Sequence, residues 1–174
     1  MLQTLTRILF PPACVGCHDP VEQTASLCPA CWADTPFIHA PFCHTCGGQL
    51  AGDMDDPADI LFCDSCMAQL PPWTKGRAIF EYGGVARDLV LGLKHADRHD
   101  LIAPFSKWAV PLALDLAPKG AVLVPVPLHW RRMAARRFNQ SELIARAVAK
   151  ELNWDVVPDA LIRRTATPSL DGKT

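Results

Sequence analysis

The chain has 174 residues, about half of them apolar, and a formal net charge of −1, so it is long enough for one ordinary domain or two small ones. No stretch approaches the run of about 18 apolar residues that a membrane span needs, which excludes membrane insertion. The N-terminal apolar segment is short and is interrupted by Arg7, which argues against a secretory signal, so we expect a cytoplasmic protein.

The charge is divided sharply along the chain. Residues 1–74 carry one basic and eight acidic residues, a formal −7, whereas residues 75–174 carry a formal +6. A sign change of this kind predicts two modules with different functions. Pro71-Pro72 marks the boundary, so we expect domains over residues 1–72 and 73–174.

All the cysteines belong to the first module and form four Cys-x-x-Cys pairs. Two intervening residues let a turn direct both sulfurs at one point about 2.3 Å away, which is the zinc–sulfur distance. We therefore predict two structural zinc ions in a double zinc ribbon, with eight thiolate ligands: Cys14, Cys17, Cys28, Cys31, Cys43, Cys46, Cys63 and Cys66.

Alternatives to this pairing and this metal exist. Sequential grouping of the cysteines is favoured over an interleaved arrangement. Disulfides are an alternative to metal binding, but they are not expected in a reducing compartment. Residues 14–18 also match the haem attachment pattern of c-type cytochromes. Iron is the alternative to zinc as the metal held by four thiolates. Since eight sulfurs close two sites, His18, His39 and His44 are interpreted as loop residues.

The second module has the alternating strand and helix patterns that are typical of an α/β domain. Residues 77–82 alternate as a strand does, 85–95 and 101–116 read as helices, and Pro111 is expected to kink or split the second of them. An apolar strand over 121–128 should end near Val124, because the prolines that follow cannot donate to a ladder.

A helix capped by Asn139 and a strand over 154–157 complete the alternation, which predicts a doubly wound α/β sheet. Ligands of such sheets lie beyond the carboxyl ends of the strands, so the segment 125–139, interpreted as a loop, is the candidate site. Its arginines, with Trp130 and Phe138 between them, suit a phosphate-rich partner such as a nucleotide or single-stranded nucleic acid. The candidate phosphate-binding residues are His129, Arg131, Arg132, Arg136, Arg137 and Asn139.

Together these motifs resemble the ComF family of competence proteins. The matching stretches are the cysteine pairs (CVGC…CPAC and CHTCGG…CDSC), YGGVARDLVLGLKH, and VPVPLHWRRMAARRFNQSELIARAVAKEL. Arg137 stands where the family pattern RGFNQ has glycine. The resemblance implies a double zinc ribbon followed by a phosphoribosyltransferase-like domain. It also implies handling of single-stranded DNA during DNA uptake, beside a helicase-like protein of the ComF operon.

The resemblance leaves the enzymatic question open. Members of the family continue to an acidic pair and a Thr/Gly loop that binds ribose 5-phosphate, and nothing here matches them, so we expect a truncated chain. Phosphoribosyl transfer from phosphoribosyl pyrophosphate with magnesium, with 125–128 at the place of the pyrophosphate loop, is an alternative that needs a complete homologous domain. A zinc-ribbon scaffold that binds only another protein is the third hypothesis.

Overall fold

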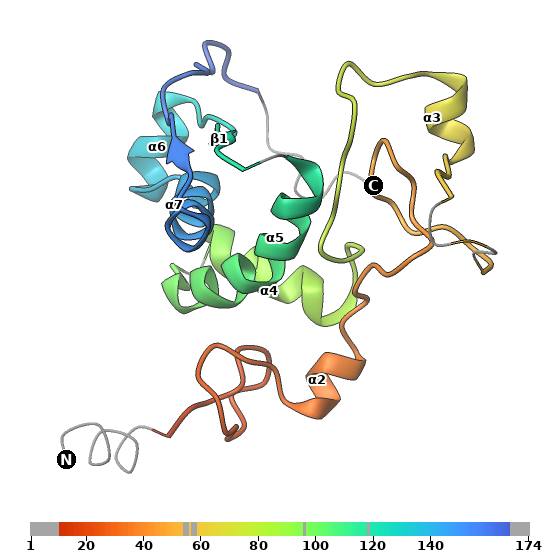
Figure 1. Cartoon of the computed structure of the whole chain (residues 1–174). Helices are drawn as coiled ribbons and strands as arrows, with labels where there is room; N and C mark the ends of the chain where they lie inside the picture. The colour runs from red at the N-terminus through yellow and green to blue at the C-terminus, as the bar shows by residue number, and fades with distance from the viewer. Residues whose placement is uncertain (1–10, 54–55, 57–58, 96, 118, 168–174) are drawn as a thin grey trace. The chain divides into compact units, whose positions relative to one another are not determined.

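The computed structural model describes residues 11–53, 56, 59–95, 97–117 and 119–167, and divides the chain into two compact units, Met1–Pro118 and Lys119–Thr174 (Figure 1). Each unit is described by itself. The helices of the first unit are α2 (Pro29–Ala33), α3 (Asp64–Ala68), α4 (Gly84–His95), the 3₁₀ turn η1 (His99–Leu101) and α5 (Ile102–Leu116). The second unit contains β1 (Val122–Leu123), α6 (Trp130–Arg136), α7 (Gln140–Leu152) and β2 (Asp155–Val156).

Two small ribbons with the same local design open the first unit: the first ribbon spans residues 12–35 and the second spans residues 41–74. Each begins with a tight turn closed by an antiparallel bridge, Ala13 with Pro20 and Phe42 with Gln49. Each ends in a one-turn helix whose N-cap is a cysteine. The repeated turn and helix bring two Cys-x-x-Cys pairs together in each ribbon.

The two longer helices of the first unit follow the apolar spacing of the sequence. In α4, Ala86, Leu89 and Leu93 are buried at helical spacing, and η1 contacts both α4 and α5. The predicted helix over 85–95 is therefore confirmed. The second predicted helix forms as η1 and α5, and α5 continues through Pro111 rather than splitting there.

An aromatic cluster joins the first ribbon to α5. Phe37, which lies between the ribbons, has its ring centroid 4.4 Å from that of Trp32 and 5.4 Å from that of Trp108. Phe105 lies 5.7 Å from both Trp108 and Phe80. Because edge and tilted contacts between aromatic rings are favourable beyond the area they bury, this cluster holds the first ribbon against α5.

The predicted strand over 77–82 is wrong. These residues form a single antiparallel bridge, Phe37 with Phe80, and its main-chain hydrogen bonds run from Ile38 N–H to the carbonyl of Ile79 and from Glu81 N–H to the carbonyl of Pro36. The side chains of this segment alternate for a different reason. Phe80 packs in the aromatic cluster, whereas Arg77 bonds to the second ribbon.

Arg77 fixes the second ribbon to α5. Its side chain is only 6% exposed, its guanidinium lies 4.4 Å from the centroid of Phe42, and it donates hydrogen bonds to the carbonyl of His44 and to the carboxylate of Asp115. Lys75 donates to the same carboxylate at 2.7 Å, and together these two cations hold the pKa of Asp115 below its usual range. The buried guanidinium of Arg77 is thus paired with a carboxylate and a carbonyl oxygen.

The second unit is built on one parallel strand pair. Val122 lies opposite Asp155 and Leu123 opposite Val156, and α6 and α7 form the crossover that a parallel pair requires. The strands predicted over 121–128 and 154–157 are confirmed as these short segments, and β1 ends just before Val124, as expected. The described residues contain a two-stranded sheet, not a doubly wound one. Among those residues, no helix is both long enough and apolar enough to cross a membrane.

Candidate metal centres and a basic helix

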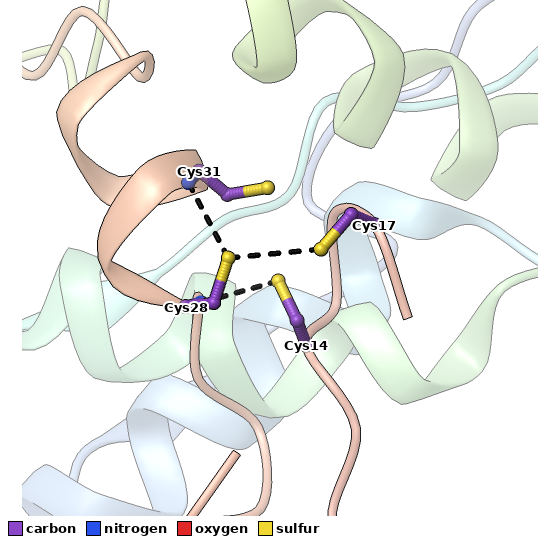
Figure 2. Close-up of side chains that lie close together, drawn as sticks. All are labelled: Cys14, Cys17, Cys28 and Cys31. Atoms are coloured by element: carbon purple, nitrogen blue, oxygen red, sulfur yellow. Dashed lines mark hydrogen bonds between the residues drawn. The ribbon is translucent and has the colours of Figure 1, made fainter. Parts of the chain in front are cut away.

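The eight cysteines gather into two groups of four, in chain order. Within each group the four Sγ atoms all lie within 4.8 Å of one another. Figure 2 shows the first group, with Cys14 and Cys17 on one turn facing Cys28 and Cys31 at the start of α2. The grouping is the sequential one that the spacing predicts, and the cysteines are free thiols rather than disulfides.

The sulfur spacing fits a tetrahedral metal. Four sulfurs at the zinc–sulfur distance lie about 3.8 Å apart in a regular tetrahedron. Cys17 Sγ lies 3.6 Å from Cys28 Sγ, and Cys46 Sγ lies 3.8 Å from Cys63 Sγ. Both separations are far longer than the roughly 2.05 Å of a disulfide bond. Four sulfur donors at this spacing suit Zn²⁺ and leave no ligand position open for a catalytic water.

Backbone amides stabilise negative charge on the sulfurs. In Figure 2, Cys28 N–H donates to Cys14 Sγ at 3.2 Å and Cys31 N–H donates to Cys28 Sγ at 3.4 Å, while Gly16 N–H also donates to Cys14 Sγ, at 3.4 Å. Burial acts to raise the pKa of Cys14, but the backbone N–H groups of Cys17, Cys28 and Gly16 outweigh it and lower that pKa to about 6. The second group repeats the pattern, because backbone donors lower the pKa of Cys43 to about 6 in spite of burial.

Two other thiols in each group have a raised pKa: Cys17 and Cys31 in the first, and Cys46 and Cys66 in the second. Burial raises the pKa of Cys66 to about 12, with the neighbouring thiols adding to the effect, and burial likewise raises the pKa of Cys31. Zn²⁺ is held by deprotonated thiols, so each group is expected to release protons when the metal binds. Within the described residues, neither group includes a histidine, in agreement with the interpretation of His18, His39 and His44 as loop residues.

Close backbone contacts support the second ribbon. Gly47 has φ +74°, and a Cβ at this position would lie 2.6 Å from Arg77 Cα. A Cβ on Gly76 would lie 2.5 Å from the carbonyl oxygen of Thr45, which also accepts a hydrogen bond from the Trp73 indole at 2.8 Å. The segment after the ribbon thus returns against the turn that carries Cys43 and Cys46, at positions where only glycine leaves room.

The predicted loop over 125–139 is wrong in part, because α6 (Trp130–Arg136) occupies its centre. His129 is the N-cap, its Nδ1 accepting a hydrogen bond from Arg131 N–H at 3.3 Å. Asn139 caps α7 by accepting from Ser141 N–H and donates its side-chain amide to the carbonyl of Val126 at 3.0 Å. Both cap residues are 7% exposed. Buried in this way, they fix the two helix starts.

The arginines of the predicted set lie on α6 and at its end. Arg131 and Arg137 are exposed, and Arg132 and Arg136 are half-buried. Arg132 donates to the carbonyl of Thr167 at 2.7 Å. Next to them, Trp130 is 68% exposed, and the guanidinium of Arg131 lies 5.3 Å from its ring centroid. An exposed indole beside guanidinium groups is a surface on which a base can stack while its phosphate is bound.

Arg137 occupies a backbone position that favours glycine. It ends α6 with φ +65°, in the left-handed region. We expect Arg137→Gly to raise the free energy of unfolding of the second unit by about 1 kcal/mol, because glycine adopts this conformation without a Cβ penalty. Chemical denaturation followed by circular dichroism measures the change.

A matched variant gives the control for this substitution. Asn153 ends α7 with φ +54°, and asparagine tolerates the left-handed region. Asn153→Gly should therefore change the free energy of unfolding by only a few tenths of a kcal/mol. Equal effects of the two substitutions, or a loss of stability in Arg137→Gly, would show that residue 137 is not strained.

Comparison of the sequence with known protein families agrees with two four-cysteine metal sites in the N-terminal part of the chain. Residues 5–67 match the double zinc ribbon domain family. The chain is also similar to the DNA utilization protein YhgH of Salmonella typhi, 29% identical over 161 residues that cover 88% of this chain and 62% of that protein. YhgH of Salmonella typhimurium strain LT2 is 28% identical and that of Escherichia coli K12 is 24% identical over the same length.

The chain thus spans about three fifths of the length of these relatives, with 62% of each covered. No solved structure matches it. The N-terminal part of the chain is a double zinc ribbon, and its two four-cysteine sites are consistent with two structural zinc ions.

Proposed function

We propose that this chain is a ComF-like protein of DNA uptake that binds single-stranded DNA through α6 and holds two structural zinc ions. In this proposal residues 1–72 are the double zinc ribbon, and residues 73–174 are part of a phosphoribosyltransferase-like α/β domain. The protein acts in the cytoplasm beside a helicase-like partner. The similarity to proteins named for DNA utilization supports the general role.

The observation that carries the DNA-binding proposal is the surface of α6. An exposed indole and four arginines lie within eight consecutive residues, 130–137. Guanidinium groups bind phosphate oxygens through paired donors, and aromatic rings accept any base by stacking. The combination suits a single strand, whose bases are free to stack, better than a closed duplex.

His129 and Asn139 take a positioning role in this proposal. Each is buried and accepts a backbone N–H at the start of a helix, so its observed hydrogen bond serves the helix start. They fix the entry to α6 and α7, and thereby the direction in which the arginines project. The contacts to DNA are assigned to Trp130, Arg131, Arg136 and Arg137.

The ribbons have a separate function. The eight cysteines hold two Zn²⁺ ions, which supply folding energy and no catalytic step, since four thiolates fill each coordination sphere. Each ion with four thiolates carries a formal −2, in a segment that is already acidic, so the ribbons repel nucleic acid. Contacts of the first ribbon, including the hydrogen bond from Arg98 to the carbonyl of Val15 at 3.1 Å, allow it to brace the α4–α5 connection.

Binding of labelled oligothymidine, measured by fluorescence anisotropy over a series of salt concentrations, tests the proposal. We expect Arg131→Ala with Arg136→Ala to weaken binding by about tenfold or more. The slope of log K against log salt should become shallower by about 1.4, because two phosphate contacts are lost. Trp130→Ala should weaken binding by about tenfold with little change in slope, because stacking of one base contributes about 1–3 kcal/mol.

A variant of equal charge separates site binding from general attraction. Arg87 on α4 and Arg146 on α7 are each 55% exposed in their side chains and are paired only with a neighbouring carboxylate, Asp88 and Glu142. Arg87→Ala with Arg146→Ala removes the same charge and should leave affinity within about twofold of the original. Absence of binding in the unaltered chain, or equal losses in the two double variants, would contradict the proposal.

A further inference from the structure

The second ribbon, residues 41–74, exposes large apolar side chains that its own fold does not use. Five of them are between 43% and 75% exposed: Ile60, Phe62, Met67, Leu70 and Trp73. Single exposed apolar residues need no explanation, but five on a ribbon of this size are typical of an interaction surface. Among them, Trp, Phe and Met are residue types enriched where proteins meet.

The charge of the same ribbon has one sign. Its described residues contain no lysine or arginine and four aspartates: Asp53, Asp56, Asp59 and Asp64. The cations that follow, Lys75 and Arg77, share the single carboxylate of Asp115 of α5, so these three groups together offset only one negative charge of the ribbon. A metal ion with four thiolates adds a further formal −2. The apolar surface therefore lies in a strongly negative field.

Three of these side chains are tied to the folded turns and helix around the metal site. His44 N–H donates to the carbonyl of Leu61 at 2.8 Å, and the ring of Phe62 lies 6.0 Å from that of His44. On the next residue, the carbonyl of Thr45 accepts from the Trp73 indole at 2.8 Å. Met67 lies on α3, whose N-cap is the ligand candidate Cys63. The surface is preorganised, which lowers the entropy cost of binding.

We propose that the second ribbon is a docking surface for a polypeptide segment that presents apolar side chains flanked by lysine or arginine. Charge complementarity selects this occupant. Nucleic acid is repelled by the negative field. A symmetric dimer through this surface would place the aspartates of one copy against those of the other, which is unfavourable. The inference goes beyond DNA binding, because it assigns a second surface on a different unit.

Binding of defined amphipathic peptides to the zinc-loaded full chain tests the proposal. The probe is a fluorescein-labelled helix-forming peptide of about 18 residues made of leucine and lysine in an amphipathic pattern. Two matched peptides replace either every lysine by glutamate or every leucine by serine. We expect the leucine–lysine peptide to bind at least about tenfold more tightly than either, since the surface requires both the apolar contacts and the positive charge.

Paired variants locate the binding. Met67→Asp with Leu70→Asp, at positions 63% and 75% exposed, should weaken binding of the leucine–lysine peptide by about tenfold or more through loss of apolar contact. The added negative charge alone would strengthen it. Leu161→Asp with Ile162→Asp, at positions 55% and 75% exposed on the second unit, adds the same charge and should not weaken binding. Zinc content and thermal unfolding verify that both variants are folded.

Several results would overturn the inference. These are equal binding of the three peptides, an affinity unaffected by Met67→Asp with Leu70→Asp, and self-association of the chain, in sedimentation equilibrium, that this double variant abolishes. Oligothymidine affinity is expected to remain unchanged in that variant, so failure of the docking proposal and failure of the DNA proposal can be told apart.

Discussion

Removal of the metal with a chelator is expected to unfold both ribbons at neutral pH. Among the described residues of 11–72, the buried apolar side chains are Val15, Leu27 and Pro41, together with Cys14, Cys43 and Cys66, which are themselves ligand candidates. Structural zinc contributes apparent free energies of about 10–16 kcal/mol, which is as large as the whole stability of a typical domain. Without the metal, little apolar burial remains to hold residues 11–72 in place.

Tryptophan fluorescence reports this unfolding, because Trp32 lies next to Phe37 and Trp73 donates to the turn of the second ribbon. We expect a cooperative change on chelation and full recovery when zinc is added back. The same chelator saturated with zinc beforehand serves as the control and should have no effect. A chain that keeps its fluorescence and circular dichroism after complete metal loss would show that the ribbons fold on burial alone.

Gly47→Ala is expected to lower the free energy of unfolding of the first unit by about 2–5 kcal/mol. The left-handed conformation at φ +74° costs a residue with a Cβ about 1–2 kcal/mol. The clash with the backbone of Arg77 and Ala78, at 2.6 and 2.9 Å, adds a cost of about 1–3 kcal/mol, because backbone atoms cannot rotate away as a side chain can. Thermal unfolding of the zinc-loaded chain measures the sum.

Gly52 supplies the matched control for the clash. Its φ is +95°, so alanine is strained there as well, but a Cβ at this position would meet nothing within 4 Å. Gly52→Ala should therefore show the conformational cost alone, about 1–2 kcal/mol. If the two variants are equally stable, the close return of residues 76–78 against the second ribbon makes no difference to stability, contrary to the account given above.

The grouping of the cysteines could be predicted from spacing alone. A Cys-x-x-Cys turn directs two sulfurs at one point whatever surrounds it, so a local rule determines the geometry. The helix after Asn139 was predictable for a similar reason, since an N-cap acts within its own turn. In both cases the information lies within a few residues, and the structure agrees: Asn139 accepts the N–H of Ser141, and each cysteine group lies in sequence order.

Elsewhere in the chain the local sequence pattern did not predict the structure; at residues 77–82 the reason is that tertiary contacts determine it. Residues 77–82 alternate like a strand, yet Arg77 is held by the second ribbon and α5, and Phe80 by the aromatic cluster. No rule of periodicity shows which distant segment a residue will meet. The segment 125–139 was interpreted as a loop because prolines open it, although residues 130–136 are good helix formers that follow an N-cap histidine. Helix propensity was the signal that could have revealed α6.

A doubly wound α/β sheet needs further strands beside β1 and β2, and the two-stranded sheet does not show them. Val122 of β1 is 51% exposed, Val124 directly after β1 is 41% exposed, and Val157 directly after β2 is 38% exposed. The sequence predicts a central strand that is apolar on both faces. The structure pairs it on one side and leaves the outer face uncovered within the described residues, so the continuity of the sheet stays a prediction.

Metal analysis of the purified chain, combined with X-ray absorption at the zinc edge, tests the central claim most directly. The account predicts two zinc ions per chain, each with four sulfur ligands at about 2.3 Å and no nitrogen or oxygen ligand. A chain that contains no zinc, a single ion, or a first shell that includes nitrogen or oxygen would contradict it.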